Sequence, residues 1–215
     1  MRYYGGQRNL AKFIVPILQK YVDESHGYWE PMCGGCNIIE HIEHEHRNAT
    51  DISVPLIALL RHVQSKLFYD IPETIGPIEY NKIREAWKNK EDYPMWYYGL
   101  VGYCASYGGK FFGGYAGESV PPGTIRNLLK QDLDGIRLGA CDFKDIPDTH
   151  RWVYYCDPPS DDTEFPWEEF YAWCKNRAKY NTVIVCKPEL PDYFECIGET
   201  VEREKPIRLY KCRIV

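Results

Sequence analysis

Val153-Tyr154-Tyr155-Cys156-Asp157-Pro158-Pro159-Ser160 is the most informative stretch of the chain. The apolar run predicts a buried strand, and the acid and the two prolines predict that this strand ends at Asp157. Because both prolines have a locked φ, a carboxylate and a carbonyl are held close together, where they can accept both hydrogens of one amino group. A purely structural turn fits the same residues equally well.

Strands and helices alternate on either side of this stretch. Buried or closing strands are predicted at residues 28–32, 47–52, 136–141, 152–157, 182–187, 193–199 and 207–214. Helical spacing or composition predicts helices at residues 8–21, 37–44, 53–68 and 167–178, with Pro16 kinking or splitting the first and Ser53 capping the third. The alternation predicts an open α/β sheet covered by helices, with ligands at the carboxyl ends of the strands.

Three more strand ends carry residues suited to a nucleoside ligand. Glu30 precedes a glycine turn containing Gly34, which would let a ligand approach the backbone closely. Asp51 follows some twenty positions later and suits ribose hydroxyls, although a helix N-cap is the alternative. Asp142 and Phe143 could bond and flank an adenine ring, or form an ordinary turn.

Residues 71–134 differ from the rest of the chain. They are rich in Gly, Pro and Tyr, and only 79–90 and 125–133 show helical pieces, which predicts an inserted, small, mainly helical subdomain. Its aromatic segment, residues 106–115, could face DNA or form the subdomain's own core. Basic side chains in this region are candidates for phosphate contacts, or else a solvated helix face: Lys82, Arg84, Lys88, Lys110, Arg126 and Lys130.

The order of these motifs resembles the Dam-type DNA adenine methyltransferases. The matching segments are YYGGQRNLAKFI (3–14), YWEPMCGGCNI (28–38), Asp51, CDF (141–143) and VYYCDPP (153–159), and SYGGKFFGGYA (106–116) is similar to phage-encoded members. The resemblance implies a Rossmann-like, S-adenosylmethionine-dependent methyltransferase sheet formed by residues 1–70 and 135–215. Residues 71–134 would then be the target-recognition subdomain, and double-stranded DNA the partner.

The resemblance also implies a role for individual residues. The residues around S-adenosylmethionine would be Tyr3, Gln7, Glu30, Gly34, Asp51, Asp142, Phe143 and Asp157. The catalytic segment would be Asp157, Pro158, Pro159 and Ser160. The target adenine would leave the duplex, and its amine would donate to the Asp157 carboxylate and the Pro158 carbonyl. No metal is implied, because the sulfonium is already a leaving group.

Four positions depart from the family pattern. Ser160 replaces an aromatic residue that stacks on the flipped base, Gln7 replaces a lysine, and Met32 replaces an aromatic residue. Lys187 follows a strand that usually ends in a small polar residue and an acid or amide. The alternative function is therefore a catalytically degenerate, methyltransferase-like protein that binds DNA, a nucleotide or a host protein without methyl transfer.

Composition excludes some of the remaining classes of protein. The 215 residues carry a formal net charge of −5, which excludes a pervasively basic nucleic-acid coat. No apolar run approaches a membrane span, and the N-terminus lacks a signal-peptide core, so we expect a cytoplasmic protein, in the host cell if phage-encoded. Cys33 and Cys36 followed by histidines at 41, 44 and 46 could suggest a zinc site, but the histidines follow too soon, so we interpret them as an exposed histidine cluster. A redox role of the cysteine pair is a further alternative. Core cysteines are expected at 104, 156, 174, 196 and 212.

Overall fold

The computed structural model describes residues 3–67, 69–117, 123–159 and 164–213. The chain divides into two compact units. A sheet unit comprises residues 7–33, 41–52 and 135–215, and a helical unit comprises residues 1–6, 34–40 and 53–134.

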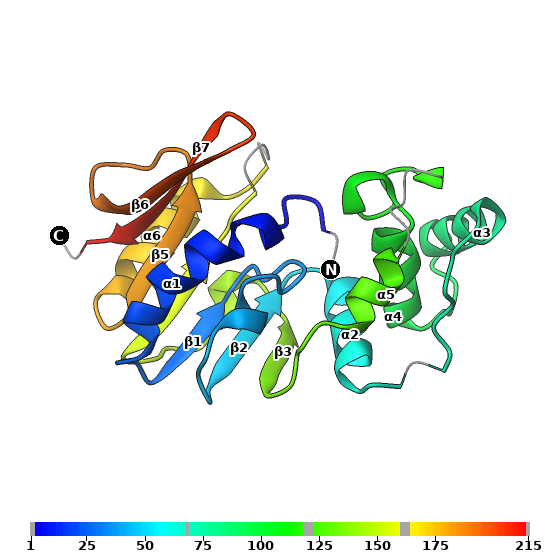
Figure 1. Ribbon diagram of the computed structural model, residues 1–215, viewed down its shortest axis with the longest axis horizontal. Helices are drawn as coiled ribbons and strands as arrows, with labels where there is room; N and C mark the ends of the chain where they lie inside the picture. The colour runs from blue at the N-terminus through cyan, green and yellow to red at the C-terminus, as the bar shows by residue number, and fades with distance from the viewer. Residues whose placement is uncertain (1–2, 68, 118–122, 160–163, 214–215) are drawn as a thin grey trace. The chain divides into compact units, whose positions relative to one another are not determined.

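The sheet unit is built on seven strands. They are β1 (Gly27–Glu30), β2 (Arg47–Asp51), β3 (Ile136–Ala140), β4 (Trp152–Cys156), β5 (Thr182–Lys187), β6 (Phe194–Glu202) and β7 (Lys205–Cys212). Their order is β3-β2-β1-β4-β5-β7-β6 (Figure 1), with β1–β5 parallel and β7 antiparallel to both β5 and β6. This arrangement confirms the α/β, Rossmann-like sheet that the sequence predicts.

Two helices cover this sheet, α1 (Ala11–Val22) in front of it and α6 (Trp167–Ala178) behind it in Figure 1. The helix predicted from Arg8 is a 3-10 turn, η1 (Arg8–Leu10), followed by α1, which continues through Pro16. Tyr154 and Cys156 on β4 share one buried cluster with the inner face of α6. Because side chains alternate along a strand, Tyr155 points to the opposite face of the sheet.

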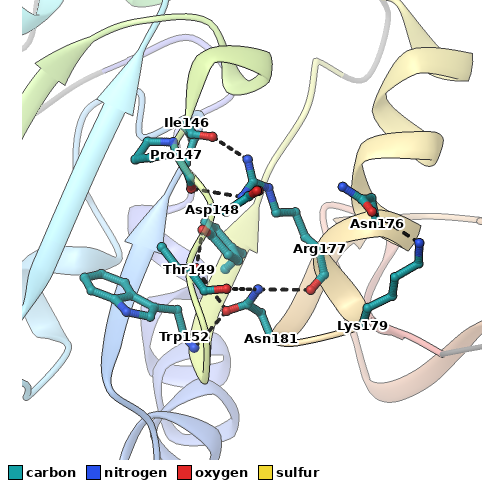
Figure 2. Close-up of polar contacts among 10 residues, drawn as sticks. Ile146, Pro147, Asp148, Thr149, Trp152, Asn176, Arg177, Lys179 and Asn181 are labelled. Atoms are coloured by element: carbon teal, nitrogen blue, oxygen red, sulfur yellow. Dashed lines mark hydrogen bonds and ion pairs between the residues drawn. The ribbon is translucent and has the colours of Figure 1, made fainter.

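Arg177 on α6 and Asn181, which follows α6, bind the loop that precedes β4 (Figure 2). The Arg177 guanidinium donates to the backbone oxygens of Ile146 and Pro147 and, over 2.7 Å, to Asp148 Oδ1. The Asn181 side-chain oxygen accepts the N–H of the first β4 residue over 3.0 Å. A buried arginine is costly unless its donors are satisfied, so these bonds fix where β4 begins.

The helical unit contains α2 (Val54–Gln64), α3 (Pro77–Lys88), α4 (Met95–Gly99), the π-helix η3 (Leu100–Cys104), the 3-10 turn η4 (Tyr107–Gly109) and α5 (Thr124–Leu129). The Ser53 side chain caps α2, as predicted, by accepting the Leu56 N–H. Phe112 and Tyr115 pack against the buried Tyr80 and so belong to the unit's own core. The described elements between residues 71 and 134 are mainly helical, as expected.

Two sequence predictions are wrong. The helix expected at residues 37–44 is only a short 3-10 turn, η2 (Ile39–His41). Cys196 is exposed rather than in the core, because it lies on the edge strand β6, whereas the other four cysteines expected inside are buried; all nine cysteines are free thiols.

Among the described residues, no group of three or more His, Cys, Asp or Glu side chains could hold a metal ion. No helix in that part of the chain is both long and apolar enough to cross a membrane.

Candidate functional site

The sheet reverses its winding between β1 and β4. From β1 the chain proceeds outward through β2 to β3, and it then returns to the other side of β1 to form β4 and β5. Ligands of doubly wound sheets bind at such a switch point, outside the carboxyl ends of the strands. Glu30 ends β1, Asp51 ends β2 and Asp157 directly follows β4, so one edge of the sheet carries all three carboxyl groups.

Glu30 and Asp51 are buried, with only 3% and 8% of their surfaces exposed. The Tyr28 hydroxyl donates to Glu30 Oε1 over 2.8 Å. The turn after β1 is tied to β2 because the Cys33 N–H donates to the Thr50 carbonyl oxygen over 2.9 Å. Buried carboxyl groups are retained in folded proteins where hydrogen bonds or ligands satisfy them, which makes this edge suited to a polar ligand.

Asp142 occupies the turn after β3. The backbone joins this turn to β2, since the Cys141 N–H donates to the Asp51 carbonyl oxygen over 3.1 Å. The Asp142 carboxylate accepts the Lys144 N–H over 3.0 Å and so caps the 3-10 turn η6 (Phe143–Asp145). The Lys144 ammonium lies 2.9 Å from Glu169, and that hydrogen bond raises the pKa of Lys144.

The aromatic residue of the same turn faces the interior. Phe143 is 5% exposed, and its ring meets those of Phe170 and Trp173 edge-on at centroid distances of 5.6 and 5.7 Å. Met32 packs against the same buried cluster. Phe143 therefore helps to form the core on the α6 side, and only a small part of its ring can contact a ligand.

Asp157, at the same edge of the sheet, has a strongly raised pKa. Burial raises its pKa from 3.8 to about 7, and the positive charge of Lys187 opposes that rise. Pro158 is buried and Pro159 is exposed. Ser160, the remaining member of the predicted catalytic segment, lies outside the described residues.

Gln7 is held by two strands of the sheet. The Tyr155 hydroxyl donates to Gln7 Oε1, and Gln7 Nε2 donates to Cys186 Sγ over 3.1 Å. Burial raises the pKa of the Cys186 thiol to about 12, so this sulfur is a neutral acceptor. Both polar ends of the Gln7 side chain are thus used within the sheet unit.

Lys187 contacts the Asp-Pro-Pro loop, a role that the sequence does not reveal. Its Nζ donates to the Pro159 carbonyl oxygen over 3.1 Å and lies 4.2 Å from the centre of the Trp167 ring. The only signal in the sequence is a basic residue at the end of an otherwise apolar strand. Trp167 therefore presents a face to Lys187 close to the predicted catalytic segment.

Two predicted cofactor residues belong to the helical unit, where they contact each other. Gly34 has a φ of +48°, a conformation that favours glycine. A Cβ at this position would lie 2.8 Å from Tyr3 Cε1, so any other residue would clash with the tyrosine ring. The Tyr3 ring also packs at 5.5 Å from that of Tyr103. The glycine turn is therefore shaped to admit an aromatic side chain.

The predicted DNA-contacting residues are spread over three parts of the helical unit. All but the partly buried Arg84 are exposed: Lys82, Lys88, Lys110, Arg126 and Lys130. Lys88 is 2.8 Å from Glu85 on the same helix, as on an ordinary solvated face. Lys110 lies instead beside the exposed ring of Tyr4, at 5.7 Å from its centre. Lys110 thus places an exposed positive charge beside an exposed aromatic ring, a combination that is common in nucleic-acid-binding sites.

No protein-family model matches the chain, and no curated protein matches it. Among solved structures, the chain is similar to yhhF, a candidate methyltransferase from Escherichia coli (11% identity, 97% of this chain and 85% of that one, TM-score 0.42). It is also similar to HI0767, a candidate methylase from Haemophilus influenzae (11%, 95% and 97%, 0.41). A third similar structure is SMU.472, a candidate methyltransferase in complex with S-adenosylhomocysteine (10%, 100% and 54%, 0.42). Likenesses this distant carry no conclusion about function, which must come from the chain's own residues.

Proposed function

We propose that this chain is an S-adenosylmethionine-dependent methyltransferase that modifies the exocyclic amino group of adenine in DNA. The observation that carries the proposal is the position of Asp157-Pro158, which follows β4 at the switch point of the sheet. The acceptor turn predicted from the sequence therefore stands at the edge where a doubly wound sheet binds its ligands.

The residues at this edge fit the proposed cofactor. Asp51 is a buried carboxyl group at the end of β2, where it suits a pair of ribose hydroxyls. Glu30, buried at the end of β1, suits the amino group of the methionine part. S-Adenosylmethionine would supply an electrophilic methyl group on a positively charged sulfur. In the helical unit, Tyr3 and Gly34 form the aromatic and glycine pair that the related family uses for the same cofactor.

On the acceptor side, the chain contributes orientation and charge. The amine of a flipped adenine would donate to the Asp157 carboxylate and to the Pro158 carbonyl oxygen. These two bonds orient the nitrogen lone pair and stabilise the positive charge that develops on nitrogen as it is methylated. The elevated pKa of Asp157, about 7, means that the carboxylate form becomes dominant only above neutrality. Methyl transfer is therefore expected to rise with pH across the neutral range.

DNA is the proposed partner, and the helical unit would supply contacts to its backbone. Lys110 is the candidate with the strongest support, because its exposed ammonium lies beside the exposed Tyr4 ring. An acidic chain needs such local positive charge to approach phosphates. The individual contacts of Lys82, Arg84, Lys88, Arg126 and Lys130 are part of the same proposal.

A second function is favoured by one observation. The Gln7 side chain is occupied by Tyr155 and Cys186 and carries no charge at a position where the related family has a lysine. A protein that keeps the sheet and the ligand edge but has lost methyl transfer would tolerate this change. Such a protein would bind DNA, a nucleotide or a host protein.

Calorimetric titration with S-adenosylhomocysteine tests the cofactor site first, without requiring a known DNA target. We expect wild type to bind and Asp51→Ala to bind at least about 100-fold more weakly, because two hydrogen bonds to a charged group, each contributing about 1.5–3 kcal/mol, are lost. Asp145→Ala removes an exposed carboxylate at the same end of the sheet and is the matched control. Absence of binding by folded wild-type protein would contradict the proposal.

Transfer of a labelled methyl group from S-adenosylmethionine to unmethylated genomic DNA separates the two functions. Asp157→Ala should lose methyl transfer by at least about 100-fold, a much larger loss than in its affinity for S-adenosylhomocysteine, since both orientation and charge stabilisation of the amine are removed. Turnover by Asp157→Ala equal to that of wild type would exclude the mechanism. Binding by wild type without transfer to any genomic DNA would favour the second function.

A further inference from the structure

Lys187 ends β5, and its ammonium contacts two segments that are distant from it in sequence. Nζ lies 3.1 Å from the carbonyl oxygen of Pro159, which is 28 residues away. The same atom lies 4.2 Å from the centre of the ring of Trp167, the first residue of α6. A lysine side chain is flexible, so two simultaneous contacts define where its charge is held.

These contacts act on the part of the turn that its prolines leave free. Proline locks φ but not ψ, so the direction of the Pro159 carbonyl needs a further restraint. A charged N–H donor forms a stronger bond to a carbonyl than a neutral one. The Trp167 ring attracts the same ammonium through a cation–π contact. The geometry thus restrains the carbonyl direction at the residue that follows Pro158, the proposed amine acceptor.

The charge of Lys187 also reaches Asp157. Four titratable groups in the described part of the chain interact with this carboxyl group: Tyr155 and Cys156 on β4, and Cys186 and Lys187 on β5. Burial raises the pKa of the tyrosine and of both thiols, so these three groups are neutral near pH 7. Lys187 is the cation among the four, and it favours the ionised form of Asp157.

We propose that Lys187 is a positioning residue for the acceptor turn, which orients the Pro159 carbonyl and whose positive charge favours the carboxylate of Asp157 as acceptor for the target amine. The proposal rests on the proposed methyl transfer and assigns a function to a residue at which the chain departs from the related family. It separates two effects of one side chain. A neutral donor can hold the carbonyl, but only a positive charge can favour the carboxylate.

Four variants distinguish these effects. Lys187→Gln keeps a donor for Pro159 but removes the charge, Lys187→Met removes both, and Lys187→Arg keeps both. Lys175→Met is the matched control, because Lys175 Nζ lies 3.8 Å from the Tyr193 ring on the same sheet unit and acts electrostatically on Cys212.

The first measurement is an NMR titration of the Asp157 side chain in protein labelled with ¹³C-aspartate. The resonance is assigned as the one missing from Asp157→Asn. Opposite charges nearby shift a carboxyl pKa by about 1–3 units, so we expect Lys187→Gln and Lys187→Met to raise the pKa of Asp157 by about one unit. Lys187→Arg and Lys175→Met should leave it at the wild-type value. This readout needs neither DNA nor methyl transfer.

The second measurement is the pH profile of methyl transfer. If the pKa of Asp157 rises by one unit, the ionised fraction of this carboxyl group at pH 7 falls from about one half to about one tenth. The kcat of Lys187→Gln should therefore be about fivefold lower than that of wild type at pH 7 and should recover near pH 9. KM for S-adenosylmethionine should not change. Lys187→Met should not recover fully at high pH, because the Pro159 carbonyl has lost its donor.

The outcomes separate this proposal from the proposed function. An unchanged Asp157 pKa in folded Lys187→Gln, or a pKa raised equally in Lys187→Arg, would overturn the role of Lys187. If Lys187→Met does not fold, the comparison of Lys187→Gln with Lys187→Arg still decides. Failure of wild type to transfer methyl groups would overturn the proposed function and, with it, the catalytic part of this inference. The pKa titration alone still decides whether Lys187 controls the charge of Asp157.

Discussion

Asp157 is expected to destabilise the folded protein increasingly as pH rises, and Asp157→Asn tests this directly. The pKa of this carboxyl group is about 7 in the folded chain, against an ordinary value of 3.8, because burial disfavours its charge. The folded state therefore binds this proton more tightly than the unfolded chain. The stability that Asp157 contributes is fully present below about pH 4 and is lost as pH rises through about 7.

The size of the effect follows from the two pKa values. A difference of about 3 units, at about 1.4 kcal/mol per unit, sets an upper limit of about 4 kcal/mol. Asp157 is only partly buried, so solvent and local relaxation lower the cost, and we expect about 2–4 kcal/mol. Asparagine has the same shape without the charge, so Asp157→Asn should unfold at a higher urea concentration than wild type in alkaline solution.

Urea unfolding at about pH 5, 7 and 9 measures the difference between the two proteins. The advantage of Asp157→Asn should be largest at the highest pH and smallest at the lowest. Asp145→Asn, at an exposed position, controls for the loss of one negative charge. A difference that stays constant, or that shrinks as pH rises, would refute the reasoning.

Four further substitutions test the fold, each by urea or thermal unfolding. Arg177→Met leaves two backbone carbonyls without their charged donor and should lower the free energy of unfolding by about 3 kcal/mol. Asp148→Ala removes the exposed partner of Arg177 and should lower it by less than about 1 kcal/mol. Equal losses in the two variants would contradict this assignment. Ser53→Ala removes the α2 cap and should cost about 1 kcal/mol, with no loss if the cap is unimportant. Gly99→Ala would place a Cβ 2.2 Å from the Pro55 carbonyl oxygen and should cost more than about 2 kcal/mol; a neutral result would show that the helices can separate.

Much of the sheet unit could be predicted because its elements are strongly patterned. The bounds of α6 (167–178) and β5 (182–187) agree with the structure to the residue. β5 is a continuous apolar run, and α6 carries its large side chains on one face, so composition and spacing alone identify both. The closing pair of strands is likewise confirmed, and the structure shows that β6 and β7 are antiparallel.

The helical unit was harder to predict, because burial there removes the usual pattern. Residues 98–104 are buried all round and so show no amphipathic period, although they form the end of α4 and all of η3. Gly99 and Gly102 suggest a loop, but they allow close packing against Pro55 and the Phe111 ring. The helix predicted at 37–44 is reduced to the single turn η2, since a segment this short forms few helical hydrogen bonds to offset the cost of nucleation.

The candidate site was predictable as far as strand ends go. Glu30, Asp51 and Asp157 lie where their strands stop, and a parallel sheet brings such ends to one edge. The contacts of Gln7 could not be predicted, because its partners lie 148 and 179 residues away. Local patterns contain no information about which distant side chains will meet.

The alternation along β4 has a consequence for how this protein can evolve. Tyr154 and Cys156 belong to the cluster under α6, whereas Tyr155 bonds Gln7 on the opposite face and immediately precedes the segment that leads to Asp157. Selection for a well-packed interior and selection for a ligand therefore act on alternate residues of this one strand. A saturation library across this strand should show low tolerance at every buried position, for different reasons. Packing under α6 would limit Tyr154 and Cys156, and the hydrogen bond to Gln7 would limit Tyr155.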